Sequence, residues 1–594
     1  MTASSIARSA ALLLALSAAA FFGLHTGDAH AAGFADFLRT NMAPIMFATL
    51  VVFLLLGYPV AFALAANGLL FAVVGIELGQ FQENFLQALP ERIYGTMNND
   101  VLLAIPFFTF MGLVLERSGM AEDLLDTIGQ LFGPIRGGLA YAVIFVGALL
   151  AATTGVVAAS VISMGLISLP IMLRYGYDRR LATGVIAASG TLAQIIPPSL
   201  VLIVLADQLG RSVGDMYEGA FIPGLVLSAL YAGYVFLITM IYPNRAPGLP
   251  PEAQTLRDAD GKIRRLSLLV ITIISFGLAY LYMKFYTKVS AGADFVVLTM
   301  SIAVGLSFVI ALINKALGLN LLSRMAEQVV FVMVPPLALI FLVLGTIFIG
   351  LATPTEGGAM GAAGAILLAW SKKRMTFDLL KQATEATAKL SAFVLFILVG
   401  ARVFSLTFYG VNGHLWVEHL LIGLPGGTTG FLVVVNVMVF LLAFFLDFFE
   451  LAFIIVPLLG PAADKLGIDL IWFGIILAVN MQTSFMHPPF GFALFFLRSV
   501  APKNAYKDKV TGKMMEPVTT AQIYWGAVPF VVIQCIMVAL VVIFPQMVMH
   551  YKSSAVQLDQ KSIDKQFDSI QIPGLGGIGG MPDLNFAPPG APKP

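Results

Sequence analysis

The chain has 594 residues, of which 59% are hydrophobic and only 11% are charged, against about 25% charged residues in an average soluble domain. Apolar runs long enough to span a bilayer recur along most of its length, which indicates a polytopic membrane protein without a second sizeable soluble domain. The formal net charge of +1 gives no sign of nucleic-acid binding, and the single cysteine, Cys535, leaves the redox compartment undecided.

The first 31 residues have the features of a cleavable secretory signal. Arg8 is followed by an apolar run from Ala10 to Leu24 and then by Ala29-His30-Ala31, an order that is typical of signal peptides. An uncleaved extra span or an over-extended gene start would give the same pattern. We therefore exclude residues 1–31 from the predicted fold and leave their cleavage open.

Apolar segments follow along the rest of the chain, and a segment of about 20 residues suffices to cross a bilayer. They lie near residues 43–76, 100–116, 138–173, 181–206, 219–243, 266–287, 293–313, 327–350, 355–371, 388–407, 429–462, 469–497 and 524–549. Segment 43–76 would be about 51 Å long as one helix, so we expect two helices with a break at Gly57-Tyr58-Pro59. Residues 375–390 mix charged and apolar side chains, which predicts a separate interfacial arm helix.

Loop charge predicts two re-entrant hairpins. Cytoplasmic loops carry an excess of Lys and Arg, and basic residues lie on both sides of segment 138–173, with Arg136 before it and Arg174 after it. The loop 411–428, which precedes segment 429–462, has no Lys or Arg, so the ends of this second hairpin are expected in the periplasm. An odd number of crossings separates the hairpins, which would invert one relative to the other.

The prolines give an independent sign of a repeat. Adding 291 to the positions of Pro170, Pro197 and Pro198 leads to Pro461, Pro488 and Pro489. Adjacent prolines remove two backbone donors and clash with the preceding turn, so each helix should be interrupted. We therefore predict an all-α polytopic membrane protein with two inverted repeats. The expected organisation is a first half at 43–243 with hairpin 138–173 and broken helix 181–206, a basic cytoplasmic loop at 244–265, connecting scaffold helices at 266–313, a second half at 327–549 with hairpin 429–462 and broken helix 469–497, and a disordered Gly/Pro-rich tail at 552–594.

The paired interruptions indicate the central site of a transporter. Irregular backbone at membrane depth is tolerated only where it lines a cavity. In transporters, paired broken helices hold cations and anionic groups near the midplane of the bilayer. Proline kinks that serve only packing are the alternative explanation.

Five stretches carry a resemblance to a known family: "TTGVVAASVISMG", "IIPPS", "LATPTEGGAMGAAGA", "FLDFFELAFIIVPLLGP" and "NMQTSFMHPPFGFALFFLRSVAP". In order and spacing they resemble the large membrane subunit of the tripartite ATP-independent periplasmic (TRAP) transporters, from about residue 44 to residue 549. The resemblance implies an elevator-type importer of organic anions in the bacterial inner membrane. Sodium ions would be the coupling ions, and no other cofactor is implied.

The same resemblance implies partners. Besides the lipid bilayer, these are a small four-helix membrane subunit, a periplasmic substrate-binding protein and a carboxylate substrate. The chain departs from the family pattern at two places. Thr153-Thr154-Gly155 stands where Ser-Gly-Ser is usual, and His487 stands where a small residue is usual before the Pro-Pro pair.

The repeat and the resemblance together select candidates for the sodium and substrate site. These are Thr153, Thr154, Gly155, Gln194, Pro197, Pro198, Ser199, Thr353, Thr355, Glu356, Asp447, Glu450, Asn480, Gln482, Thr483, Ser484, His487, Pro488 and Pro489. Oxygen ligands suit a hard cation. Sodium binding through backbone and hydroxyl oxygens is therefore expected near Thr153, Ser199 and Thr483.

Several of these side chains have a structural alternative. Carboxylates at membrane depth are costly, and Glu356, Asp447 and Glu450 could either have a cation or gating role or hydrogen-bond to the hairpin backbone. His487 could equally be a packed side chain. Arg402 could meet a substrate carboxylate or pair with an acidic group.

We predict no catalytic residue and no enzymatic activity, and we find no Walker-type loop or Cys/His metal spacing. Two alternatives remain. One is a stand-alone sodium/dicarboxylate symporter, and the other is an intramembrane enzyme that uses His487 with Asp447 or Glu356. The sequence does not identify the substrate, although the resemblance favours 2-oxo acids, lactate or C4-dicarboxylates over sialic acid.

Overall fold

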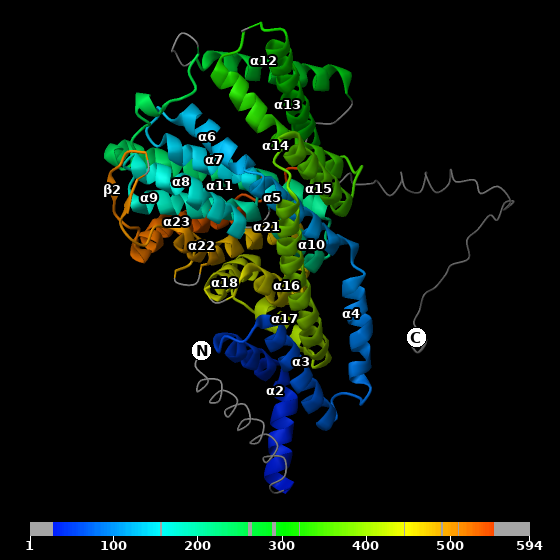
Figure 1. The fold of residues 1–594 in the computed structure, drawn as a ribbon. Coiled ribbons are helices and arrows are strands. Elements are labelled where there is room, and N and C mark those ends of the chain that lie inside the picture. The colour runs from blue at the N-terminus through cyan, green and yellow to red at the C-terminus, as the bar shows by residue number, and fades with distance from the viewer. Residues whose placement is uncertain are drawn as a thin grey trace, which may run out of the picture. The chain divides into compact units, whose positions relative to one another are not determined.

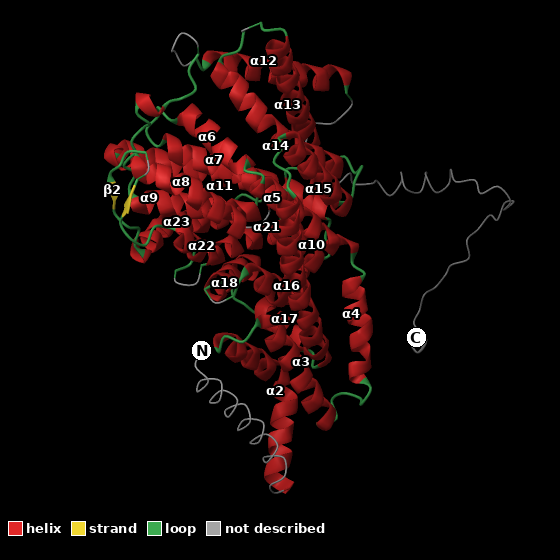
Figure 2. Ribbon diagram, viewed as in Figure 1, coloured by secondary structure: helices red, strands yellow, loops and turns green. Residues whose placement is uncertain are grey.

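A computed structural model describes residues 28–551 apart from residues 155–156, 259–263, 288–292, 320, 445, 489–490 and 509. Almost all of this part is helical (Figures 1 and 2). Nine helices in it are long and apolar enough to cross a membrane, and the number rises to 11 if two bent helix pairs each count as one span. The prediction of an all-α polytopic membrane protein is confirmed. Residues 1–27 of the predicted signal, the tail at 552–594, Gly155 and Pro489 lie outside the described residues.

Most of the helices follow one another with short connections, and longer ones precede α12 and α23. In chain order they are α2 (Asp28–Leu55), α3 (Val60–Glu77), α4 (Leu89–Met97), α5 (Ala104–Arg117), α6 (Met120–Phe132), α7 (Gly138–Thr154), α8 (Val157–Arg174), α9 (Arg179–Thr191), α10 (Leu200–Leu209), α11 (Val213–Ile241), α12 (Leu266–Tyr286), α13 (Ala293–Ala316), α14 (Arg324–Phe348), α15 (Pro354–Ser371), α16 (Phe377–Gly410), α17 (Gly413–Ile422), α18 (Gly427–Leu442), α19 (Phe448–Glu450), α20 (Val456–Lys465), α21 (Leu470–Met481), α22 (Phe492–Val500), α23 (Thr520–Ile543) and α24 (Gln546–Met549). A π-helical turn, η6 (Leu451–Ile455), joins α19 to α20, and 3-10 turns η3 (Leu192–Gln194) and η7 (Gln482–Phe485) extend α9 and α21.

The first apolar segment is divided where the sequence predicts. Helix α2 ends at Leu55 and α3 begins at Val60. Gly57 has a φ of 80°, which favours glycine, and Pro59 lies directly before the first turn of α3, where its missing N–H costs nothing. Helix α2 begins at Asp28, so residues 28–31 of the predicted signal belong to it.

Three features differ from the prediction. Helix α16 is one continuous helix of 34 residues rather than an arm helix and a separate span, because no Gly or Pro interrupts residues 377–399. Shorter helices, among them α6 and α17, were not predicted from hydropathy. Two short strands, β1 (Tyr506–Lys507) and β2 (Met514–Met515), pair antiparallel after α22.

The helices around the two Pro-Pro pairs begin and end at matching positions. Adding 291 to the bounds of α8, as for the prolines, gives 448–465, which are the bounds of the helical segment from α19 to α20. The same shift moves α9 to 470–482, next to the bounds of α21, and moves the start of α10 to 491, one residue before α22 begins. The helix boundaries therefore follow the spacing of the prolines.

Helix α16 packs closely on α3 and α5, and in Figure 1 it runs through much of the length of the described part. Glycines allow the close approach to α3. A Cβ added at Gly68 would lie 2.7 Å from the carbonyl oxygen of Val403, and one at Gly400 would overlap the carbonyl oxygen of Ala61. Helices α12 and α13 pack on each other and α13 packs on α14 at the opposite end of the described part (Figure 1).

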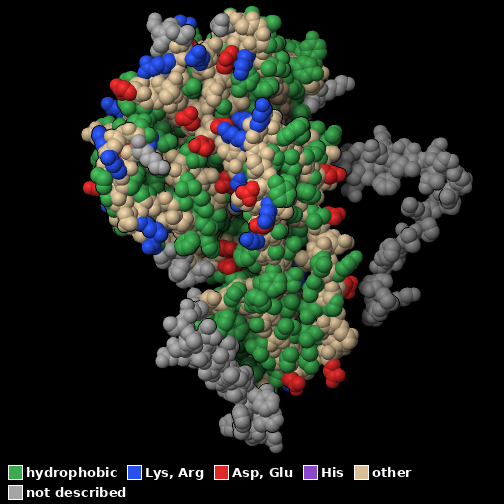
Figure 3. Space-filling view, in the orientation of Figure 1, with side chains coloured by type: hydrophobic (Ala, Val, Ile, Leu, Met, Phe, Trp, Pro, Cys, Tyr) green, Lys and Arg blue, Asp and Glu red, His purple; other side chains and the backbone are tan. Residues whose placement is uncertain are grey.

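Basic residues gather at one end of the molecule. Figure 3 shows Lys and Arg side chains over the upper half of one face, whereas hydrophobic side chains dominate its lower part.

The loop after α22 is tied to the end of α8, because Arg174 and Asp508 form an ion pair at 2.9 Å. Hydrogen bonds from the Thr511 side chain and backbone, together with Arg174, lower the pKa of Asp508 to about 2.

Candidate substrate and cation site

A cavity of about 200 Å³ lies where both predicted hairpins and both interrupted helices meet α16. We call it the hairpin-tip cavity. It is lined by Val157, Ala158, Gln194, Leu200, Val201, Leu390, Phe393, Asp447, Phe448, Phe449, Phe485, Phe492 and Phe496. Segments from the first and second halves of the sequence thus line one cavity.

Many of the lining residues correspond to one another through the shift of 291. Val157 and Phe448 form such a pair, and so do Ala158 and Phe449, Gln194 and Phe485, and Val201 and Phe492. The members from the first half are small or polar, whereas all the members from the second half are phenylalanine. One side of the cavity is therefore aromatic, and the other carries smaller aliphatic side chains and the amide of Gln194.

Four helices begin at the wall of this cavity. Val157, Leu200, Phe448 and Phe492 are the first residues of α8, α10, α19 and α22. The first turn of a helix has N–H groups without intrahelical partners and carries the positive end of the helix dipole. Helix starts can hold an anionic ligand, and two of these four already have side-chain caps, Ser199 on α10 and Asp447 on α19.

Asp447 and Glu450 cap the helix that begins at Phe448. The backbone N–H of Glu450 donates to Asp447 Oδ1 at 2.9 Å, and the backbone N–H of Asp447 donates to Glu450 Oε2 at 2.8 Å. This is a reciprocal capping box. Of the two roles left open for these carboxylates, hydrogen bonding to the hairpin backbone is the one that the geometry displays. A direct contact with a cation stays a prediction.

The two interruptions share a hydrogen-bond pattern. The amide of Ile195 bonds to the carbonyl of Leu192 at 3.1 Å, and the amide of Met486 bonds to the carbonyl of Thr483 at 2.8 Å. These two pairs of donor and acceptor are again related by the shift of 291. In a continuous α-helix each amide would bond to the residue four positions earlier. Both helices therefore tighten before they break.

The hydroxyls at the interruptions bond locally. Ser199 Oγ donates to the carbonyl of Gln194 at 2.6 Å and caps α10 by accepting from the amide of Val201. Thr483 Oγ1 donates to the carbonyl of Asn480 at 2.7 Å. Within the described part of the chain, three buried side-chain oxygens at the interruptions have no hydrogen-bond partner, Gln194 Oε1, Gln482 Oε1 and Ser484 Oγ. They are side-chain oxygens still able to serve a ligand there.

Gln482 links the two interruptions directly. Its Nε2 donates to the carbonyl of Thr191 at 2.8 Å and lies 3.1 Å from Thr191 Oγ1. Thr191 and Gln482 are also related by the shift of 291. Gln534 joins this buried cluster by donating to Tyr231 Oη at 3.0 Å. Thr191, Tyr231 and Gln534 were missed in the sequence, although polar side chains within apolar runs were the available signal.

Asn480 ties the second interrupted helix to its hairpin, since its Nδ2 donates to both the carbonyl and Oδ1 of Asn436 at 2.8 Å.

His487 is packed between Phe440 and Phe444, with ring centroids 4.5 and 4.0 Å away. It is not among the residues that line the hairpin-tip cavity. The prolines Pro197, Pro198 and Pro488 likewise border the breaks without lining the cavity.

Thr353, Thr355 and Glu356 lie elsewhere, at the beginning of α15. Thr353 and Glu356 form another capping box, and both are exposed. Thr355 Oγ1 donates to the carbonyl of Asp100 at 2.6 Å. None of the three lines the hairpin-tip cavity. The side chains of Thr153 and Thr154 are outside what the structure describes.

A comparison with protein-family models matches residues 47–330 and 309–547 to the DctM component of the tripartite ATP-independent periplasmic transporters. The chain belongs to this family. The prediction made from the five motifs is thereby confirmed, and the DctM-family chain is a transporter permease of the membrane rather than a member of an enzyme family.

Known relatives of this DctM-family chain differ in substrate. It is 27% identical over 425 residues to the C4-dicarboxylate TRAP transporter large permease protein DctM of Pseudomonas aeruginosa, covering 71% of this chain and 82% of that one. It is 23% identical to the ectoine TRAP transporter large permease protein TeaC of Halomonas elongata, and the match covers 86% of this chain and 100% of that one. A solved structure, the YdaH transporter of Alcanivorax borkumensis, is 13% identical with a TM-score of 0.45 and covers 77% of this chain and 87% of that chain.

Proposed function

We propose that this permease imports small organic anions, carboxylates of a few carbon atoms, by sodium-coupled secondary transport across the bacterial inner membrane. A small four-helix membrane subunit and a periplasmic substrate-binding protein would act with it, as the TRAP family implies. The observation that carries the proposal is the hairpin-tip cavity, where four helices begin around one space. Their N-terminal N–H groups suit a carboxylate.

The size of the cavity supports a small substrate. A volume of about 200 Å³ equals the liquid volume of about seven water molecules. Relatives are named as transporters of C4-dicarboxylates and of sialic acid. A C4-dicarboxylate, lactate or a 2-oxo acid suits this volume better than a sugar acid does. The phenylalanines on one side would cover the carbon chain of the acid while the helix N-termini face its carboxylate.

Sodium is proposed for the oxygen atoms at the two interruptions. Gln194 Oε1 and Ser484 Oγ are buried and unpaired in the described part, and unpaired buried oxygens are costly unless a ligand uses them. Backbone carbonyls and half-helix ends of broken membrane helices hold coupling ions in other transporters. Two cation sites, one at each interruption, would follow from the matching hydrogen-bond patterns.

We also propose that the two halves are inverted repeats and that transport is of the elevator type. A contact between Thr191 and Gln482, which are equivalent under the shift of 291, is what a two-fold relation between the halves would produce near its axis. The long helix α16 would be part of a fixed scaffold. The unit that carries the hairpin tips would slide along it.

Cysteine labelling tests the inverted arrangement. In a background without Cys535, a label at Arg136→Cys or Tyr175→Cys should react from the cytoplasm, because basic residues flank the first hairpin. A label at Thr428→Cys or Leu466→Cys should react from the periplasm. Accessibility of each site to an impermeant maleimide, in intact and in permeabilised cells, gives the measurement. If either pair splits across the membrane, the inverted hairpins are wrong.

Reconstituted uptake tests sodium coupling. Proteoliposomes that hold both membrane subunits, with loaded binding protein outside, should take up carboxylate when sodium is outside and should lose this uptake when choline replaces sodium. Two or more sodium ions per carboxylate would carry net charge inward, and each charge yields about 2.3 kcal/mol per 100 mV. A negative interior should therefore speed uptake.

Three results of this assay would count against the proposal. Uptake that continues without sodium would remove the coupling, and uptake that needs ATP inside would remove secondary transport. Sodium-driven uptake without the binding protein would favour the stand-alone sodium/dicarboxylate symporter instead.

A further inference from the structure

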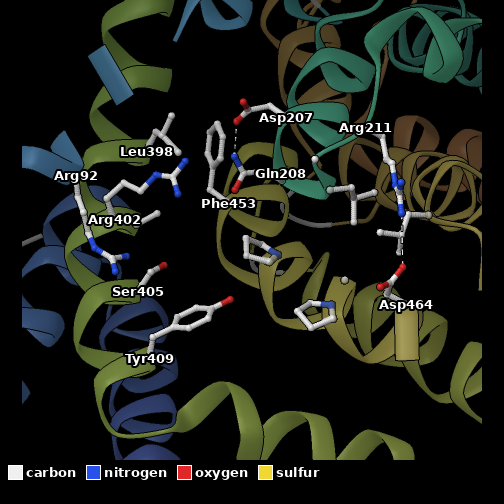
Figure 4. Close-up of a pocket in the computed structure, with 17 residues that line it drawn as sticks. Arg92, Asp207, Gln208, Arg211, Leu398, Arg402, Ser405, Tyr409, Phe453 and Asp464 are labelled. Carbon is white, nitrogen blue, oxygen red and sulfur yellow. Dashed lines mark hydrogen bonds and ion pairs between the residues drawn. The ribbon is translucent and has the colours of Figure 1, made fainter. Parts of the chain in front are cut away.

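A second and larger cavity, of about 800 Å³, lies between α16 and the segments around the ends of α10 and α20 (Figure 4). We call it the outer cavity. Helices α4 and α16 contribute one wall, with Arg92, Leu398, Arg402, Ser405 and Tyr409. The facing wall includes Asp207, Gln208, Arg211, Phe453 and Asp464. It shares no lining residue with the hairpin-tip cavity.

The charged side chains of the facing wall already have hydrogen-bond or ion-pair partners. Arg211 pairs with Asp464 at 3.5 Å. The carboxylate oxygens of Asp207 accept hydrogen bonds from two amides, Asn99 Nδ2 at 2.6 Å and Gln208 Nε2 at 2.7 Å. These side chains therefore hold one another, and they offer little to a ligand.

The arginines of the α16 wall have no such partners. Arg92 and Arg402 form no ion pair or hydrogen bond through their side chains within the described residues, and Figure 4 draws both guanidinium groups toward the cavity on the same side. Arg402, Ser405 and Tyr409 are three and four residues apart, so they lie on one face of α16. The hydroxyls of Ser405 and Tyr409 also form no hydrogen bond there. Two cations and two hydroxyls thus share one wall of the cavity, and no acidic side chain lines that wall.

We propose that Arg402, assisted by Arg92, binds a carboxylate in the outer cavity before that carboxylate reaches the hairpin-tip cavity. An arginine presents a fork of donors that matches a carboxylate in two hydrogen bonds. A bound anion would also relieve the repulsion between two neighbouring guanidinium groups. The hydroxyls of Ser405 and Tyr409 would donate to the same ligand.

The place of this site along α16 gives it a role in transport. Basic residues 372–374 precede α16, so its beginning is expected in the cytoplasm and its end, beyond Arg402, toward the periplasm. Phe393 lines the hairpin-tip cavity and lies nine residues before Arg402, about 14 Å along the helix. An anion from the periplasm would therefore meet Arg402 first. This ordering rests on the proposed import of carboxylates, whereas anion binding by Arg402 does not.

Direct binding is the first test. The full chain with its small subunit, purified in detergent, is titrated with succinate by calorimetry in a sodium-free choline buffer. Arg402→Gln should weaken binding by about tenfold or more, and Arg92→Gln should weaken it less. Arg211→Gln is the matched control, because that arginine lies in the same cavity but is paired with Asp464. It should bind succinate like the unaltered protein.

Uptake gives the second measurement. Arg402→Gln should raise the carboxylate concentration for half-maximal uptake while the maximal rate and the sodium dependence stay the same. Arg402→Lys keeps the charge but not the fork, so it should restore binding only in part. The melting temperature of each variant shows whether it is folded. If Arg402→Gln is not folded, Arg402→Lys is compared with the unaltered protein instead.

The outcomes separate the two proposals. Succinate binding that depends on Arg402, together with uptake that ignores sodium, would keep the outer site and overturn the sodium-coupled function. Equal succinate binding by the unaltered protein and Arg402→Gln would overturn the outer site. So would an equal loss in Arg211→Gln, or binding of anionic lipid headgroups in place of succinate.

Discussion

Replacing Gln482 by methionine is expected to lower the apparent sodium affinity of uptake by about tenfold. A change of this size corresponds to the lower part of the range of about 1–3 kcal/mol that is typical for the coupling free energy between two sites. Gln482 lies at the second interruption and donates to the carbonyl of Thr191, the last residue of α9, at 2.8 Å. Methionine has a similar shape but no donor, so the contact between the two interruptions would be lost. Sodium titration of uptake in proteoliposomes gives the measurement.

The same substitution should also destabilise the fold. It leaves a buried carbonyl without its side-chain donor, which costs about 1–3 kcal/mol, so the melting temperature should fall. Gln534→Met is the matched control, because Gln534 is equally buried and belongs to the same cluster but donates to Tyr231 Oη and, at 3.4 Å, to the hydroxyl of Thr191 rather than to the carbonyl of Thr191. It should lower the melting temperature without changing the sodium dependence. If both variants shift the sodium dependence alike, Gln482 is only part of a stabilising polar core.

The interruptions could be predicted because their cause is local. Proline lacks the amide proton that a helix needs, whatever packs around it, and the spacing of the prolines then located the second break from the first. The breaks at Pro197-Pro198 and before Phe492 lie where this reasoning put them. Both breaks and α16 line one cavity because of tertiary packing. From the sequence, this shared cavity was a hypothesis drawn from other transporters.

The roles of the acidic residues could have been predicted better. The sequences Asp447-Phe-Phe-Glu450 and Thr353-Pro-Thr-Glu356 both have the spacing of a capping box, and both form one. These acidic residues were selected because each is a charge within an apolar run. The distance of three positions between the two residues of each pair already indicated the start of a helix. The group at Thr353 to Glu356 lies at the start of another helix, α15, and its part in the site stays a prediction.

Contacts between distant segments were beyond the sequence. Nothing in an apolar run shows which of its polar side chains will face a partner, so the pairing of Gln482 with Thr191 and of Asn480 with Asn436 could not be anticipated. The aromatic half of the hairpin-tip cavity was missed for a similar reason. Phenylalanines such as Phe485 and Phe492 are ordinary lipid-facing or core residues until the fold brings them to one cavity.

Replacing Gly184 by alanine is expected to destabilise the protein strongly. Gly184 lies in α9 at the point where α23 crosses it, and a Cβ there would overlap the backbone carbonyl of Gly526. The backbone cannot rotate away as a side chain can, so the two helices would have to separate. Overpacking of this kind costs about 1–3 kcal/mol, occasionally more, and we expect the upper end of that range. The melting temperature and the yield of monodisperse protein measure it.

Gly233→Ala provides the control with the opposite sign. Gly233 lies inside α11, and a Cβ added to it meets no atom within 4 Å. Alanine favours the helix over glycine by about 0.5–1 kcal/mol, so this variant should be as stable as the unaltered protein or slightly more stable. The same chemical change would then stabilise one membrane helix and disrupt another. If Gly184→Ala melts like Gly233→Ala, α9 and α23 do not approach as closely as described, and the packing that holds Thr191 beside Gln482 has to be revised.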